Sequence, residues 1–325
     1  MQNGGITFMD RTAEGKGGKL LRTALCTAAL VSVFVMTAAS ERVSAGVTSA
    51  MKLCVKSLIP AIFPFLVLNG ILVRCGFPEK AGKIIGAPVS FLFGIDRSLA
   101  AAVVTGFLCG FPAGAAAADG IFASGLCRKE DVGRASLCSS FASPGFMIAG
   151  VGVSMLGSAR AGIALWLFQA AAVMCAGITV NLVSPVKLSG NGYTGRKVAV
   201  SPLSAVSAAV KESAESMLGI CGSVIFFSVF SGFALSLGSL PAAVRCVIAC
   251  FFEMTSGTAA AAEMLPPDIA FVAAAWAAGW SGISVHAQTS LVTGGKTGGR
   301  YVAGKALTSL LSALFAAAAL KTGLI

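Results

Sequence analysis

Charged side chains are scarce in this chain, and histidine is almost missing. Charged residues make up 11% of the sequence and hydrophobic residues 56%, and the mean hydropathy is +0.86. Soluble domains carry roughly 25% charged residues, so this composition excludes an ordinary soluble globular protein. The single histidine argues against a zinc site built from imidazoles, and we expect neither a metal nor a cofactor.

The signatures of several enzyme classes are missing as well. No Gly-x-x-x-x-Gly-Lys-Ser/Thr sequence occurs, which argues against ATP hydrolysis by the chain itself. Ser281 and His286 lie five positions apart, without an acidic neighbour that the sequence could place in a catalytic triad. The ten cysteines form no Cys-x-x-Cys pair, and most lie in apolar runs as small packing residues. We therefore expect a protein that is not an enzyme.

Long apolar runs are what the sequence has in abundance. A helix of about 20 mainly apolar residues crosses a bilayer. The runs predict an all-α, polytopic membrane protein with about 8–9 hydrophobic segments, some of them broken or re-entrant. They cover residues 20–40, 44–73, 99–125, 135–158, 161–184, 217–239, 242–264, 269–293 and 303–322.

The net charge of +11 reflects membrane topology better than a nucleic-acid surface, because the basic residues are spread over many loops. Those before the first run predict a cytoplasmic N-terminus; they are Arg11, Lys16, Lys19 and Arg22. Residues 38–40 resemble a signal-peptide cleavage site, but the run from 20 to 40 is longer than a typical signal core and favours a retained helix.

A polar stretch divides the chain into two membrane halves. We expect a cytoplasmic tail at 1–19, a first half at 20–184, a linker at 185–216 and a second half at 217–325. Residues 205–215 suit either an amphipathic surface helix or a solvated connection. The polar residues of the linker include Lys187, Asn191, Arg196, Lys197, Lys211, Glu212 and Glu215.

The two halves resemble one another weakly. Residues 63–65, 112–118 and 142–146 of the first half match residues 226–227, 255–262 and 279–283 of the second. The match predicts a two-fold internal repeat of the kind found, often inverted, in secondary transporters, with a site near the midplane. The alternative is that membrane helices rich in small residues look alike by chance.

Glycine, proline and hydroxyl residues interrupt several apolar runs. Residues 110–114 (Gly-Phe-Pro-Ala-Gly), 139–144 and 280–288 are the main interruptions. An unpaired backbone group costs several kcal/mol in hydrocarbon, so such breaks survive only where protein or water covers them. They predict discontinuous helices whose ends meet an ion or a polar solute; the alternative is a close helix crossing through small residues.

Few ionisable residues lie inside the apolar runs, and each is a candidate for a functional role. They are Asp119, Glu253 and His286, although Asp119 could lie at the interface and a lone histidine could be a packing residue. Together with the breaks they give the predicted substrate-binding set: Gly110, Phe111, Pro112, Gly114, Asp119, Ser143, Pro144, Glu253, Thr255, Ser281, Ser284, His286 and Gln288.

Five segments resemble the sporulation integral membrane protein YlbJ family, within the wider group of nucleoside-recognition or Gate-domain membrane proteins. They are residues 58–65, 110–114, 143–146, 253–257 and 282–288, of which the last (Gly-Ile-Ser-Val-His-Ala-Gln) is the most specific. The resemblance covers most of the chain. It implies a Gate-type protein of endospore-forming bacteria that is needed for spore cortex formation.

The leading hypothesis is a transporter-like protein in the plasma membrane or the forespore membrane, which binds a small polar or anionic solute through Glu253 and His286. The expected partners are the lipid bilayer and this solute, without nucleic acid; other sporulation membrane proteins and an oligomer stay open. The alternative is a non-transporting membrane scaffold or signalling partner in spore assembly.

Overall fold

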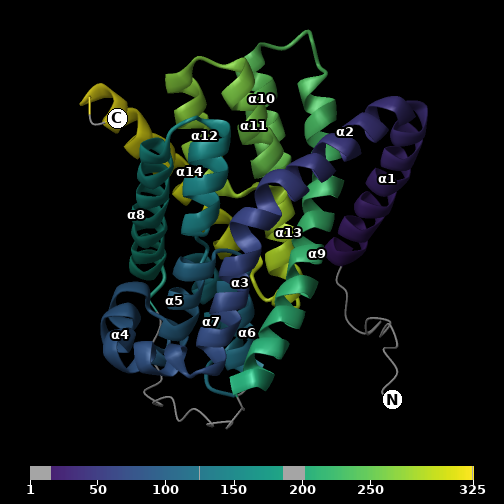
Figure 1. Ribbon diagram of the computed structural model, residues 1–325. Helices are drawn as coiled ribbons and strands as arrows, with labels where there is room; N and C mark the ends of the chain where they lie inside the picture. The colour runs from purple at the N-terminus through teal and green to yellow at the C-terminus, as the bar shows by residue number, and fades with distance from the viewer. Residues whose placement is uncertain (1–15, 124, 186–201, 324) are drawn as a thin grey trace. The chain divides into compact units, whose positions relative to one another are not determined.

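The computed structural model describes residues 16–123, 125–185, 202–323 and 325, and these residues form helices and loops without a β-strand. The all-α prediction is confirmed for this part of the chain. The chain divides into two compact units, Met1–Ala45 and Gly46–Ile325. In the smaller unit α1 spans Lys16–Ala38, and α2 (Ser40–Leu53) begins there and ends in the larger unit (Figure 1).

The larger unit consists of helices of very different length. Three short elements have other helical geometries: the π-helices η1 (Cys54–Leu58) and η3 (Phe146–Met155), and the 3₁₀-helix η2 (Arg97–Leu99). The α-helices that follow α2 are α3 (Ile59–Arg74), α4 (Phe77–Phe93), α5 (Ala100–Cys109), α6 (Ala113–Ala123), α7 (Lys129–Cys138), α8 (Ala159–Val183), α9 (Pro202–Leu235), α10 (Ala242–Phe252), α11 (Met254–Met264), α12 (Pro267–Trp280), α13 (Gly282–Val292) and α14 (Gly298–Lys321).

Several helices are long and apolar enough to cross a membrane. Among the described residues these are Ala159–Val183, Leu203–Leu235, Pro267–Val292 and Gly298–Lys321, which makes four, or up to six if each bent helix pair counts as one span. Large apolar side chains such as Leu182, Leu218 and Leu314 are exposed on them. Lipid tails would cover this surface, and the chain is a membrane protein.

The predicted count of about 8–9 hydrophobic segments, some of them broken or re-entrant, is higher than the four to six spans of the described residues. Several of the predicted apolar runs do not form one long helix, because glycine, proline or a polar residue splits them. The run 99–125 becomes α5 and α6, and the run 242–264 becomes α10 and α11. An 11-residue helix such as α10 is about 16 Å long, roughly half of the hydrocarbon core.

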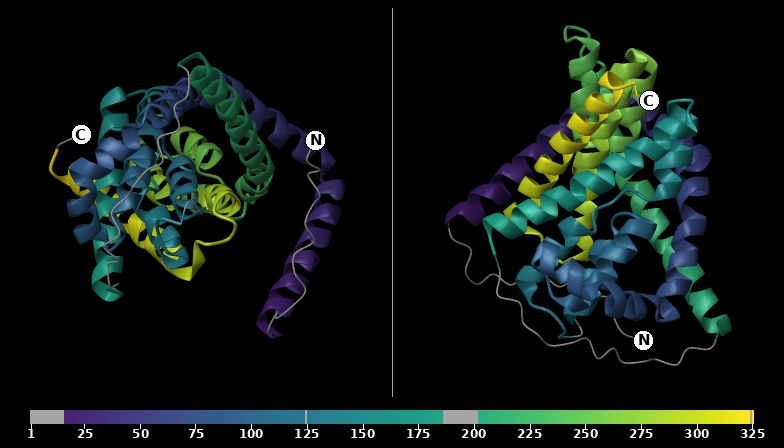
Figure 2. Two further views of the ribbon diagram at one scale, coloured as in Figure 1. Left: turned by 90° about the horizontal axis from the view of Figure 1, so that it is seen from below. Right: turned by 90° about the vertical axis from the view of Figure 1, so that its left-hand side faces the viewer.

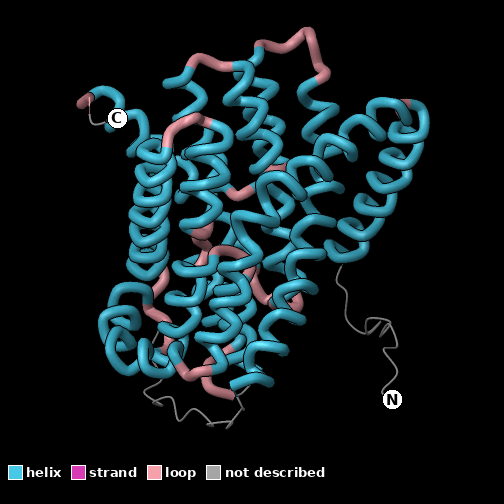
Figure 3. Tube along the Cα trace, in the orientation of Figure 1, coloured by secondary structure: helices cyan, strands magenta, loops and turns pink. Residues whose placement is uncertain are grey.

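The split runs form two helical hairpins that enter the larger unit from opposite ends. α5 packs against α6, and α10 packs against α11. In Figure 1 the α5–α6 hairpin lies at the lower end of the larger unit and the α10–α11 hairpin at the upper end. Figure 3 shows short loops in the middle of the unit, between these two ends. Gly114 lies directly on Gly106, and Gly257 directly on Cys250, so each hairpin closes through small residues.

The order of elements is the same in both halves, as an internal repeat predicts. In the first half the α5–α6 hairpin is followed by α7, a break, η3 and the long helix α8. In the second half the α10–α11 hairpin is followed by α12, a break, α13 and the long helix α14. The long helices α8 and α14 pack against each other (Figure 2). The matched segments 112–118 and 255–262 lie at the beginning of the second helix of each hairpin, and the matched segments 142–146 and 279–283 lie at the breaks after α7 and α12.

Part of the predicted linker is helical. Residues 202–216 form the beginning of α9, where Glu212 makes an ion pair with Arg74 of α3. The N-terminal residues 1–15, with Arg11, and the segment 186–201, with Lys187, Asn191, Arg196 and Lys197, lie outside the described residues.

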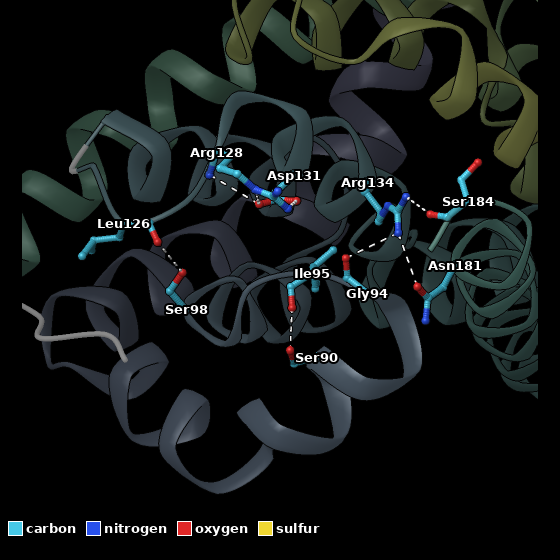
Figure 4. Close-up of polar contacts among 10 residues, drawn as sticks. All are labelled: Ser90, Gly94, Ile95, Ser98, Leu126, Arg128, Asp131, Arg134, Asn181 and Ser184. Carbon is cyan, nitrogen blue, oxygen red and sulfur yellow. Dashed lines mark hydrogen bonds and ion pairs between the residues drawn. The ribbon is translucent and has the colours of Figure 1, made fainter. Parts of the chain in front are cut away.

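A buried arginine fixes the corner where the α4–α5 turn meets α7 and α8 (Figure 4). Arg134 donates to the carbonyl oxygen of Gly94 at 3.4 Å, to Asn181 Oδ1 at 3.4 Å and to the carbonyl oxygen of Ser184 at 2.7 Å. Ser90 Oγ donates to the carbonyl oxygen of Ile95 at 2.7 Å and closes the turn. These bonds satisfy main-chain carbonyls that the turn would leave unpaired.

The close approach at Gly106 predicts a stability change. A Cβ atom there would collide with the main chain of Ser139, whereas a Cβ atom at Gly222 in α9 would meet nothing within 4 Å. We expect Gly106→Ala to lower the free energy of unfolding by about 1–3 kcal/mol. Gly222→Ala should leave it equal or slightly higher, since alanine favours a helix by about 1 kcal/mol over glycine. Thermal unfolding of the purified variants checks this, and equal midpoints for both would contradict the packing.

Candidate functional site

Four interruptions of the helices converge on one cavity inside the larger unit. They lie between α5 and α6, between α7 and η3, at Glu253 between α10 and α11, and at Ser281 between α12 and α13. The cavity holds about 460 Å³ of empty space, counted to its open mouth. Its polar lining residues are Ser143, Glu253, Thr255, Ser284 and Gln288, and its apolar walls include Phe111, Phe146, Met254, Ile220 and Val224.

The two breaks of the first half support each other through main-chain contacts. Phe111 N donates to the carbonyl oxygen of Phe141 at 2.8 Å. Gly110 has a φ of 80°, and a Cβ atom at this position would lie 2.6 Å from the main-chain nitrogen of Ser143. Only glycine fits both the left-handed backbone and the close approach. The predicted interruptions at 110–114 and 139–144 therefore form one layer of the cavity.

Glu253 is the cap of a helix rather than a free charge. Its Oε1 accepts from Thr255 N at 2.9 Å and its Oε2 accepts from Ser256 N at 2.6 Å, at the N-terminus of α11. A carboxylate here satisfies main-chain donors and meets the positive end of the helix dipole. Because its side chain also lines the cavity, a bound solute can donate to the oxygen lone pairs that the cap leaves over.

Ser281 makes the break of the second half in a strained conformation. Its φ is 73°, in the left-handed region that residues other than glycine seldom adopt. Its Oγ donates to the carbonyl oxygen of Ala278 at 3.0 Å, and Gly282 lies against the main chain of Glu253 and Met254. Strain of this kind costs about 1–3 kcal/mol and persists where the surroundings impose it.

Lys305 of α14 bonds to the residue at this break and was missed by the sequence prediction. Its Nζ is fully buried and donates to Ser281 Oγ at 2.8 Å and to Ser140 Oγ at 3.1 Å. The ammonium also lies 5.8 Å from the ring centre of Phe111. No acid of the described residues forms an ion pair with it. One amine thus joins the breaks of both halves.

The spacing of the polar residues around Lys305 is a sequence signal for its burial. Tyr301, Thr308 and Ser312 recur at helical spacing with Lys305 and are buried with it. A polar face within the otherwise apolar run 303–322 indicates that this face points inward rather than toward lipid.

Gln169 of α8 is a second bridge that the sequence prediction missed. Its Oε1 accepts from Ala142 N at 2.9 Å, and its Nε2 donates to the carbonyl oxygen of Ala278 at 2.7 Å. The side chain is completely buried. Gln169 satisfies one main-chain group from the break of each half, as both ends of its amide require.

His286 lies beside the second break but not in the cavity wall. Its Nε2 is 3.1 Å from the carbonyl oxygen of Trp280, and because a carbonyl only accepts, Nε2 carries the hydrogen. The ring packs between Trp280 and Tyr301, with ring centres 4.4 and 5.4 Å away. Ser281 Oγ and His286 Nε2 are both engaged with other groups.

The structure brings only some of the predicted substrate-binding residues to the cavity. Phe111, Ser143, Glu253, Thr255, Ser284 and Gln288 line it. Gly110, Pro112, Gly114, Pro144, Ser281 and His286 belong to the breaks or their surroundings and do not line it. Asp119 lies away from it, in an ion pair with Lys296 at 2.7 Å.

Two cavity residues retain unused hydrogen-bonding capacity. The hydroxyl of Ser284 is fully buried and has no hydrogen-bond partner among the described residues. The amide of Gln288, four residues on and therefore on the same face of α13, makes no hydrogen bond within the described part of the chain. A buried polar group without a partner costs about 1–3 kcal/mol, which a polar ligand can recover.

No group of three or more histidine, cysteine, aspartate or glutamate side chains that could hold a metal ion occurs in the described residues. Comparisons of the chain with protein-family models, curated proteins and solved structures find no match.

The bridge by Gln169 predicts that a Gln→Leu substitution lowers stability more at position 169 than at position 288. Gln169→Leu removes the partners of two buried main-chain groups and should lower the free energy of unfolding by about 2–4 kcal/mol. Gln288→Leu removes no protein hydrogen bond and should change stability by less than about 1 kcal/mol. Thermal unfolding of both purified variants tests the assignment, and similar losses in both would show that Gln169 is not a bridge.

Proposed function

We propose that this membrane protein binds a small polar solute in the central cavity and moves it across the bilayer. The observation that carries the proposal is the buried hydroxyl of Ser284, which lacks a partner and lies in the same cavity wall as Glu253 and Gln288. Unsatisfied polar groups that converge in a cavity are typical of a ligand site.

The cavity chemistry suits a compact solute with hydroxyl or amine donors and an apolar part. Glu253 can accept hydrogen bonds, Gln288 can donate and accept, and Ser284 can do either. The remaining wall is apolar and holds Phe111 and Phe146. The space open to water-sized molecules is about 40 Å³, so a solute larger than a few water molecules would have to push the cavity walls apart.

Two hairpins with their tips at one cavity support a transport role over a purely static site. The tip of the α5–α6 hairpin contributes Cys109 and Phe111, and the tip of the α10–α11 hairpin contributes Glu253 to Thr255. Because the hairpins approach from opposite ends, movement of either one would open the cavity to one side of the membrane.

The resemblance in segments such as 282–288 supports a role in spore cortex formation, in the plasma membrane or the forespore membrane, and we propose a cytoplasmic N-terminus. This context is part of the proposal and rests on those sequence segments. The basic residues that precede the first apolar run support the orientation. Lipid and the solute are the proposed partners, with neither nucleic acid nor enzymatic turnover.

A non-transporting scaffold in spore assembly is the second candidate. The bridges favour it, because Gln169 and Lys305 satisfy several break groups without any ligand. In that case the breaks would serve only to pack helices against each other.

Solute binding at the Ser284 hydroxyl can be tested with a matched control at Ser312. We expect the purified protein to be stabilised by one class in a panel of nucleosides, amino acids, carboxylates and cortex precursors. Ser284→Ala should weaken that binding roughly ten-fold, since a ligand hydrogen bond is lost. Ser312→Ala removes another buried, unpartnered hydroxyl outside the cavity and should leave the affinity unchanged. Thermal shift titrations measure both.

The same titrations separate the two functions. A scaffold predicts no ligand-dependent shift for the unsubstituted protein across the panel. A shift that Ser284→Ala and Ser312→Ala reduce equally would also contradict a solute site at Ser284.

A further inference from the structure

A second cavity lies where α7 meets the beginning of α14, and it shares no lining residue with the central one. It holds about 680 Å³ of empty space, counted to its open mouth. Its walls come from α7, from Val180 of α8 and from residues 296–301. Three of the side chains that line it are basic: Arg134, Lys296 and Arg300.

The first turn of α14 forms one wall of this basic cavity and offers main-chain donors. Thr297 precedes the helix and provides no side-chain cap. The first N–H groups of this 24-residue helix therefore receive no side-chain cap from Thr297, and within the described residues no other side chain is seen to cap them. Gly133 of α7 lets the turn approach, because a Cβ atom there would lie 2.6 Å from the carbonyl oxygen of Thr297.

The charges of the wall do not cancel. Arg134 is 7% exposed, and its hydrogen bonds go to the uncharged acceptors of Gly94, Asn181 and Ser184 (Figure 4). Arg300 is exposed and makes no ion pair within the described residues. Lys296 is neutralised by Asp119 at 2.7 Å, and Glu130 is the acidic residue of the lining.

We propose that the basic cavity binds a phosphate group, carried by an anionic phospholipid or by a soluble phosphate compound. A helix N-terminus with free N–H groups binds such anions, and a guanidinium matches the oxygens of phosphate with paired donors. Arg300 contacts the phosphate directly, and buried Arg134 supplies positive charge behind it. The site is independent of the solute proposed for the central cavity.

Arg300→Gln tests the site without disturbing the core, because this side chain is exposed on the first turn of α14. The probes are inorganic phosphate, added to the protein in neutral detergent, and nanodiscs of phosphatidylglycerol compared with phosphatidylcholine. We expect binding to weaken roughly ten-fold in Arg300→Gln, as loss of a charge-assisted contact predicts. Lys321→Gln removes one positive charge at the opposite end of the same helix and should bind as before.

Glu130→Gln should change the phosphate affinity in the opposite direction, and a misfolded variant would not bind more tightly. It removes the carboxylate of the cavity wall and should tighten binding several-fold. A phosphate-dependent thermal shift identifies a soluble ligand, and a shift confined to phosphatidylglycerol identifies a lipid headgroup; either supports the proposal.

Sodium chloride at equal ionic strength controls for screening. The site is overturned if neither probe binds, if Arg300→Gln binds as tightly as the unsubstituted protein, or if Lys321→Gln loses as much. Ser284→Ala should leave phosphate binding intact, so failure here and failure of the solute site are distinguishable.

Discussion

The interior of this protein depends on satisfying the main chain where its helices are interrupted. Each break frees N–H and C=O groups that hydrocarbon cannot pair. Gln169 and Lys305, one from each of the long packed helices α8 and α14, reach the breaks of both halves. Glu253 satisfies the main-chain N–H groups at the break between α10 and α11, because it caps α11. These side chains make the breaks a stable structure instead of a defect.

The cavity follows from this arrangement. Glycines at 106, 110, 114 and 257 let the hairpins close tightly, while the bridges hold the loops between them. Helix ends need space for caps and turned carbonyls, so the tips cannot pack as densely as continuous helices. The space that is left is lined by groups that the protein does not use itself, above all Ser284 and Gln288.

The breaks could be predicted from the local sequence, because glycine, proline and hydroxyl residues in an apolar run interrupt the helix at their own positions. Local sequence signals also gave the helical class and several cavity residues, such as Ser143 and Glu253. They overestimated the number of spans, since hydropathy does not distinguish one long helix from a hairpin of two short ones. Lys305 and Gln169 were missed, because their partners lie 24 to 165 residues away. Asp119 does not line the cavity, and its partner Lys296, 177 residues away, could not be predicted for the same reason.

An experimental density map of the protein in a lipid nanodisc tests the central claim most directly, provided that it resolves side chains. It should show Lys305 Nζ within hydrogen-bond distance of Ser140 and Ser281, and the tips of both hairpins around one cavity away from lipid. A continuous helix through residue 281, or hairpin tips that face acyl chains on separate sides, would contradict it.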